Sequence, residues 1–265
     1  QLRGDNDDDS VLAQVVALKG DKASLMPLSN LPGLTIGTPI EPGLTEASTL
    51  VGDPLIGRVL NGWGEPIDGQ GPLHCSERVP LYPPPLNPMD RGMVEEPLSV
   101  GVRAIDGLLT CGAGQRLVIM AGAGVGKSTL LAMMARNTEA DVTVLGLIGE
   151  RSREVRNFVE RELGPEGRRK SVVVSSTSNT SVALRIRAAF LATSIAEYYR
   201  SKGLKVLLLV DSLTRICMAQ RELGLAIGEP PTTRGYPPSS FAIIPELLER
   251  AGTRSEEHTS ELQSQ

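Results

Sequence analysis

Short apolar runs alternate with glycine and proline turns through the first eighty residues. These runs show few helical periods, and such spacing is typical of the strands of a small all-β domain. Asn61-Gly62 is a strong hairpin-turn signal. We therefore predict a small N-terminal β-barrel over residues 1–81. Its expected strands cover residues 11–18, 23–27, 35–40 and 55–60.

Residues 82–97 separate this region from the rest of the chain. They contain five prolines, which fix an extended backbone and remove hydrogen-bond donors. We predict that this stretch is a linker between two domains.

Beyond the linker, apolar runs without polar alternation are each followed by a longer amphipathic segment. This order predicts a parallel sheet that is covered on both faces, and hence an α/β domain over residues 98–253. The expected strands are residues 117–121, 142–147, 171–175 and 206–210. The expected helices are residues 127–137, 153–163 and 183–201.

Composition narrows the function classes. The chain has 265 residues, 27 basic against 31 acidic side chains, and eight aromatic residues. Without a basic excess or an aromatic platform, nucleic-acid binding is not expected. Three cysteines and two histidines leave little material for a disulfide framework, a Cys/His metal site or a Ser/His/Asp triad. No apolar run approaches the roughly 20 residues of a membrane helix, so we expect a soluble cytoplasmic protein.

The most informative stretch is LVIMAGAGVGKSTLL, residues 117–131, because it joins an expected strand to an expected helix through a glycine-rich turn. Such a turn lets backbone N–H groups surround phosphate oxygens at a helix N-terminus. Lys127 would contact the β and γ phosphates, Ser128 would supply a hydroxyl to Mg²⁺, and Thr129 would lie near the α phosphate. The full candidate loop is Ala121, Gly122, Ala123, Gly124, Val125, Gly126, Lys127, Ser128 and Thr129.

This loop departs from the G-x-x-x-x-G-K-[ST] pattern only at Ala121, where smallness is retained. An accidental glycine-rich turn is the alternative. It is disfavoured because Lys127 would lie poorly at the positive end of a helix unless an anion compensated it.

Two further strands are expected to end in acidic residues at the same edge of the sheet. KVLLLVDSLTR places Asp211 at the end of an apolar run, where it would hold Mg²⁺. An Asp in this position can also be a plain helix N-cap.

LGLIGERSREV places Glu150 and Arg151 at the end of another apolar run. Glu150 is suited to polarise a water molecule, and Arg151 is suited to neutralise phosphoryl charge. The alternative, surface charges at a helix start, stays equally open from the pattern alone.

Taken in order, these motifs resemble those of the catalytic subunits of rotary-type ATPases, and most closely the type III secretion and flagellar export ATPases. GRVLNGWGEPIDG, VLLLVDSLTR and EPPTTRGYPPS carry the likeness, which runs from about residue 11 to residue 252. The resemblance implies a RecA-like P-loop core that uses ATP and Mg²⁺. It also implies that Glu150 orients the hydrolytic water, that Arg151 contacts the γ phosphate and that Arg185 lies near the nucleotide interface. Asn179 and Ser181 replace the Asp and Pro that usually precede this arginine.

The resemblance further implies an ATP hydrolase that acts as a homohexamer at the cytoplasmic face of the inner membrane. There it would release chaperones from secreted proteins and unfold them. The implied partners are stalk and stator proteins, an export gate and chaperone–effector complexes, through which the enzyme would be peripheral to the membrane. Flagellar export stays open, as does a proton-translocating rotary ATPase. An RNA-translocating hexameric helicase is another alternative, but the first domain offers only Trp63 and Tyr82 as aromatic platforms.

The likeness stops after Gly252. Residues 254–265 resemble the translation of a sequencing adapter, so we expect a non-native tail. The family's arginine finger, adenine-contacting aromatic residue and helical C-terminal domain would lie beyond this point. We therefore expect this chain to hydrolyse ATP poorly, because a missing trans arginine typically removes about 10³ to 10⁵ in rate.

Overall fold

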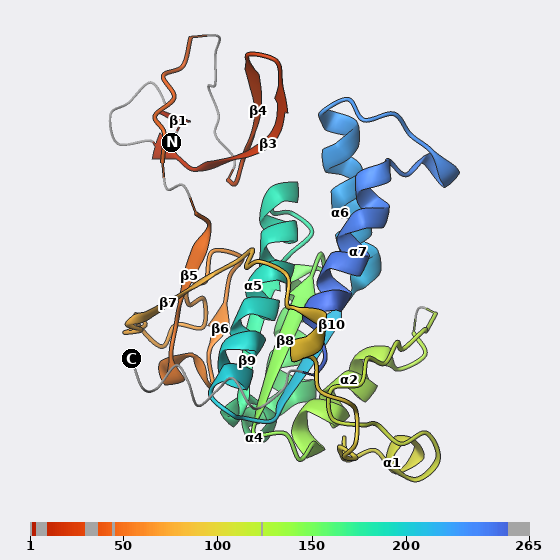
Figure 1. The fold of residues 1–265 in the computed structure, drawn as a ribbon. Helices are drawn as coiled ribbons and strands as arrows, with labels where there is room; N and C mark the ends of the chain where they lie inside the picture. The colour runs from red at the N-terminus through yellow and green to blue at the C-terminus, as the bar shows by residue number, and fades with distance from the viewer. Residues whose placement is uncertain (1, 4–9, 30–36, 44–45, 123, 254–265) are drawn as a thin grey trace.

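The computed structural model describes residues 2–3, 10–29, 37–43, 46–122 and 124–253. Its centre is a four-stranded parallel sheet in the order β10-β8-β9-β6 (Figure 1). These strands are β6 (Val59–Leu60), β8 (Val142–Ile148), β9 (Ser171–Ser176) and β10 (Val206–Asp211). Val142 of β8 lies opposite Val206 of β10, and Thr143 opposite Ser171 of β9. The predicted α/β class with a parallel sheet is confirmed.

Both faces of this sheet are covered, which explains why its strands lack polar alternation. Every residue of β8 is buried. Val144 and Ile148 join one core with α5 (Val182–Ser201), α6 (Leu213–Ala226) and α7 (Pro238–Arg250). Leu145 and Leu147 join a second core with α2 (Lys127–Asn137) and the helices that follow β8. Successive side chains therefore pack into opposite layers, as the period of a strand requires.

The helical segment after β8 has three parts. It begins with α3 (Ser152–Asn157), continues as the π-helix η3 (Phe158–Leu163) and ends with α4 (Gly164–Arg169). The predicted helix over residues 153–163 is therefore in the right place, but only its first part is α-helical. Gly164 at the end of η3 has a φ of 63°, a conformation that favours glycine and allows the change of direction into α4.

The N-terminal strands pair antiparallel in twos. The pairs are β1 (Leu2–Arg3) with β2 (Ser10–Val11), β3 (Ala13–Lys19) with β4 (Lys22–Pro27), and β5 (Ser48–Val51) with β7 (Glu77–Pro80). Of the strand expected at residues 35–40, the first two residues lie outside the described part of the chain and residues 37–40 form no strand. Closure of these pairs into a barrel stays a prediction.

The strand expected at residues 55–60 is wrong in extent and in partner. Asp53–Leu55 forms the 3-10 turn η1, and only Val59–Leu60 is a strand, β6, which pairs parallel with β9 of the central sheet. The predicted turn at Asn61 is present, because the Asn61 side chain accepts hydrogen bonds from the backbone N–H groups of Trp63 and Glu65. Part of the segment assigned to the N-terminal domain thus extends the α/β sheet.

The linker and the segment before α2 carry little regular structure. Residues 82–97 contain only the 3-10 turn η2 (Pro88–Asp90), and α1 (Arg103–Leu108) follows. The strand expected at residues 117–121 is wrong. Val118 is 61% exposed and Met120 90%, and these residues form no strand. Such an apolar run suits a central strand with a neighbour on each side, whereas a strand added at either edge of the described sheet, β10 or β6, would have a neighbour on one side only.

The connection between α6 and α7 contains the 3-10 turn η4 (Thr233–Gly235). Across the described ranges, no helix has both the length and the apolar character needed to cross a membrane.

Candidate active site

The loop before α2 leaves the N-terminus of that helix open. Gly126 is the N-cap with a φ of 94°, and no side chain caps the first turn. Gly124 has a φ of 75°, and a Cβ built on either glycine would meet nothing within 4 Å. Residues 121, 122 and 124–126 are exposed, while Ala123 lies outside the described residues. Open N–H groups with free space before them are what an anion requires at a helix N-terminus.

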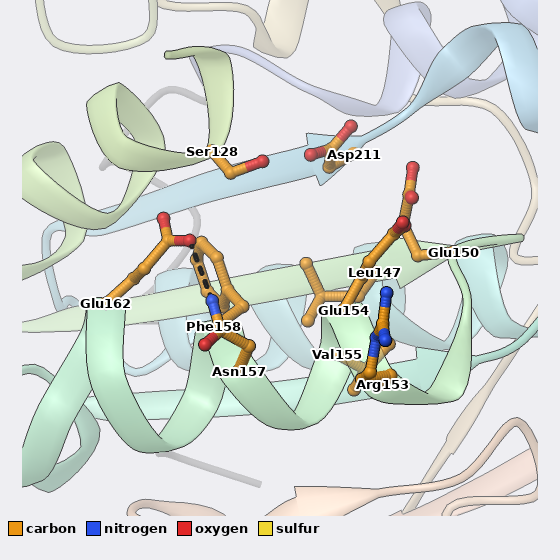
Figure 2. Close-up of a pocket in the computed structure, with 10 residues that line it drawn as sticks. All are labelled: Ser128, Leu147, Glu150, Arg153, Glu154, Val155, Asn157, Phe158, Glu162 and Asp211. Atoms are coloured by element: carbon orange, nitrogen blue, oxygen red, sulfur yellow. Dashed lines mark hydrogen bonds between the residues drawn. The ribbon is translucent and has the colours of Figure 1, made fainter. Parts of the chain in front are cut away.

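A cavity of about 420 Å³ lies beside this helix start (Figure 2). It brings together residues from α2, from the carboxyl ends of β8 and β10, and from α3 and η3. Its lining consists of Ser128, Leu147, Glu150, Arg153, Glu154, Val155, Asn157, Phe158, Glu162 and Asp211. Three of the predicted site residues, Ser128, Glu150 and Asp211, therefore share one cavity although they come from three different elements.

Lys127 joins this group through an ion pair. Its Nζ donates to Oδ1 of Asp211 over 2.5 Å, and the two side chains are 30% and 6% exposed. Asp211 is the last residue of β10, so the end of this strand positions the carboxylate opposite the start of α2 (Figure 2). The open strand end and the adjacent helix start together explain why the two predicted residues meet.

Glu150 follows β8 after Gly149 and is half-buried. Burial raises the pKa of its carboxyl group, and a hydrogen bond to Glu154 and the negative charge of Asp211 raise it further. The charges of Arg215 and Lys127 act in the opposite direction. A carboxyl group with a raised pKa is suited to exchange a proton with a bound water molecule.

Other predicted site residues lie outside the cavity lining. Arg151 is 78% exposed, with a nitrogen 3.9 Å from a Glu154 oxygen. Thr129 is exposed. Arg185 forms an ion pair of 3.0 Å with Glu222 of α6. Contacts of these three residues with a nucleotide stay predictions.

The sequence reasoning missed four charged residues: Arg153, Glu154 and Glu162, which line the cavity, and Arg215 beside it. Two of them, Glu154 and Arg215, influence the pKa of Glu150. Glu154 lines the cavity from the first turn of α3. Arg215 lies in the first turn of α6, and a Cβ on Gly149 would be 2.9 Å from the Arg215 Cβ. Both residues stand four positions after a predicted site residue, Glu150 or Asp211. One helical turn brings such positions to the same side of the chain, and that spacing was the available signal.

The two oxygen donors on the cavity, Ser128 and Asp211, fit a Mg²⁺ ion whose other ligands come from a bound phosphate and from water. The Ser128 hydroxyl and the Asp211 carboxylate are oxygen donors on the same cavity. Within the described ranges, no three His, Cys, Asp or Glu side chains form a metal-binding group. Mg²⁺ is usually bound by one or two protein carboxylates, several waters and substrate phosphates, so a two-donor site is compatible with it.

A family model described as the ATP synthase alpha/beta family, nucleotide-binding domain, matches residues 101–262. The chain belongs to this family. The match contains the whole loop before α2 and all four residues discussed above, Lys127, Ser128, Glu150 and Asp211. It also continues past Gly252, where the quoted motifs end.

Individual relatives agree with this family assignment. The chain is 52% identical over 242 residues to a flagellum-specific ATP synthase of Pseudomonas aeruginosa, which covers 91% of this chain and 54% of the relative. It is 53% identical over 240 residues to a type 3 secretion system ATPase of Xanthomonas euvesicatoria, with the same two shares. The chain thus spans about half the length of these curated relatives. The near-equal identities do not separate the flagellar branch from the secretion branch.

The fold agrees with a solved member of the secretion branch. The assembled ATPase EscN, in complex with its central stalk EscO from the type III secretion system of enteropathogenic E. coli, superposes with a TM-score of 0.85 and 45% identity. The superposition covers 91% of this chain and 60% of the EscN chain. The predicted family and its P-loop α/β core are therefore confirmed.

Proposed function

We propose that this chain binds ATP with Mg²⁺ and belongs to an ATP hydrolase that energises protein export through a type III secretion system. The observation that carries this proposal is that Ser128, Glu150 and Asp211 line one cavity beside an uncapped helix N-terminus, with Lys127 joined to them by its ion pair to Asp211. The family assignment and the named relatives support the same activity.

In the proposed reaction, the N–H groups at the start of α2 and the Lys127 ammonium bind the phosphates. Ser128 and Asp211 would hold Mg²⁺, and the charge that this ion supplies when bound would stabilise the phosphate oxygens. Glu150 accepts a hydrogen bond from the water that attacks the γ phosphorus and keeps that water aligned with the breaking β–γ bridge. Arg215 and Arg151 are the nearby cations that neutralise charge on the transferred group.

The proposed setting is a homohexamer at the cytoplasmic face of the inner membrane. Its proposed partners are a central stalk, stator proteins, an export gate and chaperone–effector complexes. The stalk has the most direct support, because EscN was solved with its stalk EscO. Flagellar export is the second candidate, because the 52% identity to the Pseudomonas aeruginosa relative is nearly the same as the identity to the secretion relative. Flagellar genes beside the coding sequence would favour that branch, and secretion-stalk genes would favour the first.

The nucleotide site is tested with Lys127→Ala. This variant should bind Mg·ADP at least about thirtyfold more weakly in isothermal titration calorimetry, because truncating one partner of a buried charge contact costs 2–5 kcal/mol. Lys22→Ala removes the same charge from an exposed position on β4 and is the matched control. Equal affinities of the Lys127→Ala variant and the wild-type chain would contradict the proposed site.

A further inference from the structure

The Lys127 ammonium is held by an ion pair with the Asp211 carboxylate. Asp211 is 6% exposed, and Lys127 is the cation that balances it among the described residues. The same ammonium is the group that the proposed function assigns to the phosphates. Lys127 therefore has two possible anionic partners, of which one is built into the protein.

The surroundings of Asp211 make the loss of Lys127 unfavourable. Glu150 and Glu154 are acidic residues on the same cavity, and the charge of Asp211 already raises the pKa of Glu150. Arg153 lines the cavity from α3, and Arg215 lies against Gly149. Neither arginine forms an ion pair with Asp211 in the described structure. If Lys127 turned to a phosphate, a buried carboxylate would face both acidic neighbours and the phosphate without its counter-ion.

We propose that Asp211 holds Lys127 back from nucleotides that arrive without a divalent cation, and so makes the site select Mg·nucleotide over free nucleotide. This inference rests on the proposed function and adds a specificity role for Asp211 that is separate from holding the metal. If Mg²⁺ were bound at the site, its positive charge would balance the Asp211 carboxylate, and Lys127 would be free to turn to the phosphates. Without Mg²⁺, one ammonium must serve two anions, and one of them stays unpaired.

The substitution Asp211→Asn tests whether the charge of Asp211 holds Lys127 away from Mg-free nucleotide. The amide has nearly the same shape and keeps an oxygen that can accept from Lys127, but it carries no charge. Lys127 is then free to turn to a phosphate at little cost. We expect the variant to bind Mg-free nucleotide more tightly than the wild-type chain does, which is the opposite of what loss of a binding residue would give.

The experiment measures ADP affinity by isothermal titration calorimetry, once in EDTA and once in MgCl₂. In EDTA, Asp211→Asn should bind ADP about tenfold more tightly than the wild-type chain. The ratio of the ADP affinity in MgCl₂ to that in EDTA should therefore be smaller for the variant. Glu139→Gln makes the same charge change at the far end of α2, on an exposed residue, and should alter neither affinity. An unchanged or weaker affinity of Asp211→Asn in EDTA would overturn the inference.

A double-mutant cycle with Lys127→Ala excludes simple repulsion between Asp211 and the phosphates. If Asp211 acts by holding Lys127, the gain from Asp211→Asn disappears in the Lys127→Ala background. If the gain persists there, the inference is wrong. Loss of Mg·ADP affinity in Lys127→Ala supports the proposed site whichever way the cycle comes out. The two ideas can therefore fail independently.

Discussion

Two aspartates with buried side chains, Asp68 and Asp211, are bonded to their surroundings in different ways. Asp68, 3% exposed, accepts hydrogen bonds from the guanidinium groups of Arg58 and Arg168 at 2.9 Å and from the backbone N–H groups of Val59 and Gln70. Asp211 is almost as buried, but among the described residues it has Lys127 alone as an ion-pair partner, and it borders the cavity. The first carboxylate has no remaining capacity for a ligand, whereas the second retains some.

The difference shows how a structural carboxylate is distinguished from one available to a ligand. Burial disfavours the ionised form of Asp68, yet the hydrogen bonds from Arg58, Val59 and Gln70 outweigh it and hold the pKa of this carboxyl well below its ordinary range. Asp68 thereby joins β6, through Arg58 and Val59, to α4, through Arg168. Asp211 joins β10 to the start of α2 by one contact that a ligand can replace.

Asp68→Asn should give the largest change. Removing one partner of a buried, hydrogen-bonded charge cluster leaves the arginines unbalanced, so the free energy of unfolding should fall by about 3–5 kcal/mol. Urea denaturation followed by circular dichroism measures this. Glu160→Gln, which breaks an exposed pair with Arg156, should leave the midpoint nearly unchanged. Similar losses in the two variants would remove the distinction between buried and exposed pairs.

The stabilisation that Asp68 provides depends on pH in a definite direction. Because the folded-state pKa of Asp68 is lowered, its stabilisation is fully present above the unfolded-state pKa of about 4 and is lost as the pH falls through the folded-state value. The stability difference between the wild-type chain and Asp68→Asn should therefore be constant near neutral pH and shrink below about pH 4. A difference that grows on acidification would contradict the assigned direction.

Asp211→Asn should change stability much less. Lys127 is 30% exposed and can turn towards water, and Glu150 loses a like-charged neighbour. We expect the free energy of unfolding to change by less than about 1 kcal/mol in the same urea experiment. A loss as large as that of Asp68→Asn would make Asp211 a structural residue and break the comparison.

The smallest effect concerns Glu150. Its hydrogen bond to Glu154 raises its pKa, so Glu154→Gln should lower that pKa. A carbon-13 NMR titration of the Glu150 carboxyl group measures the shift directly. Glu166→Gln removes an exposed acid on α4 and serves as the control. An upward shift in Glu154→Gln would show that Glu154 favours the ionised form of Glu150.

The sequence predicted those elements whose local pattern and packing agree. Residues 127–137 form the expected helix, and β8, β9 and β10 lie within one residue of the expected strands. The apolar run at residues 117–121 was misassigned because a strand needs neighbours, and the pattern does not state which neighbours exist. The two-residue β6 was misassigned for the same reason, since only its pairing with β9 makes it part of the central sheet.

The residues of the candidate site likewise differ in whether the local sequence pattern reveals them. Lys127, Ser128, Glu150 and Asp211 could be named from the sequence because each stands at the end of a recognisable apolar run or glycine-rich loop. Glu154 and Arg215 lie one helical turn further on, where a charged residue is also ordinary for a solvated helix. Only the folded arrangement shows that these two positions approach Glu150. Arg151, by contrast, stands in a clear motif yet lies exposed at the start of α3.

The pairing of β6 with β9 also bears on how the chain is made. Val59 leaves the ribosome more than a hundred residues before its partner Val173. At about 5–20 residues per second, the edge of β6 waits on the order of ten seconds for that partner. Asp68 likewise waits for Arg168. The first eighty residues therefore cannot complete these contacts until β9 has been synthesised, and a nascent chain stalled before β9 would expose an unpaired strand edge to other proteins.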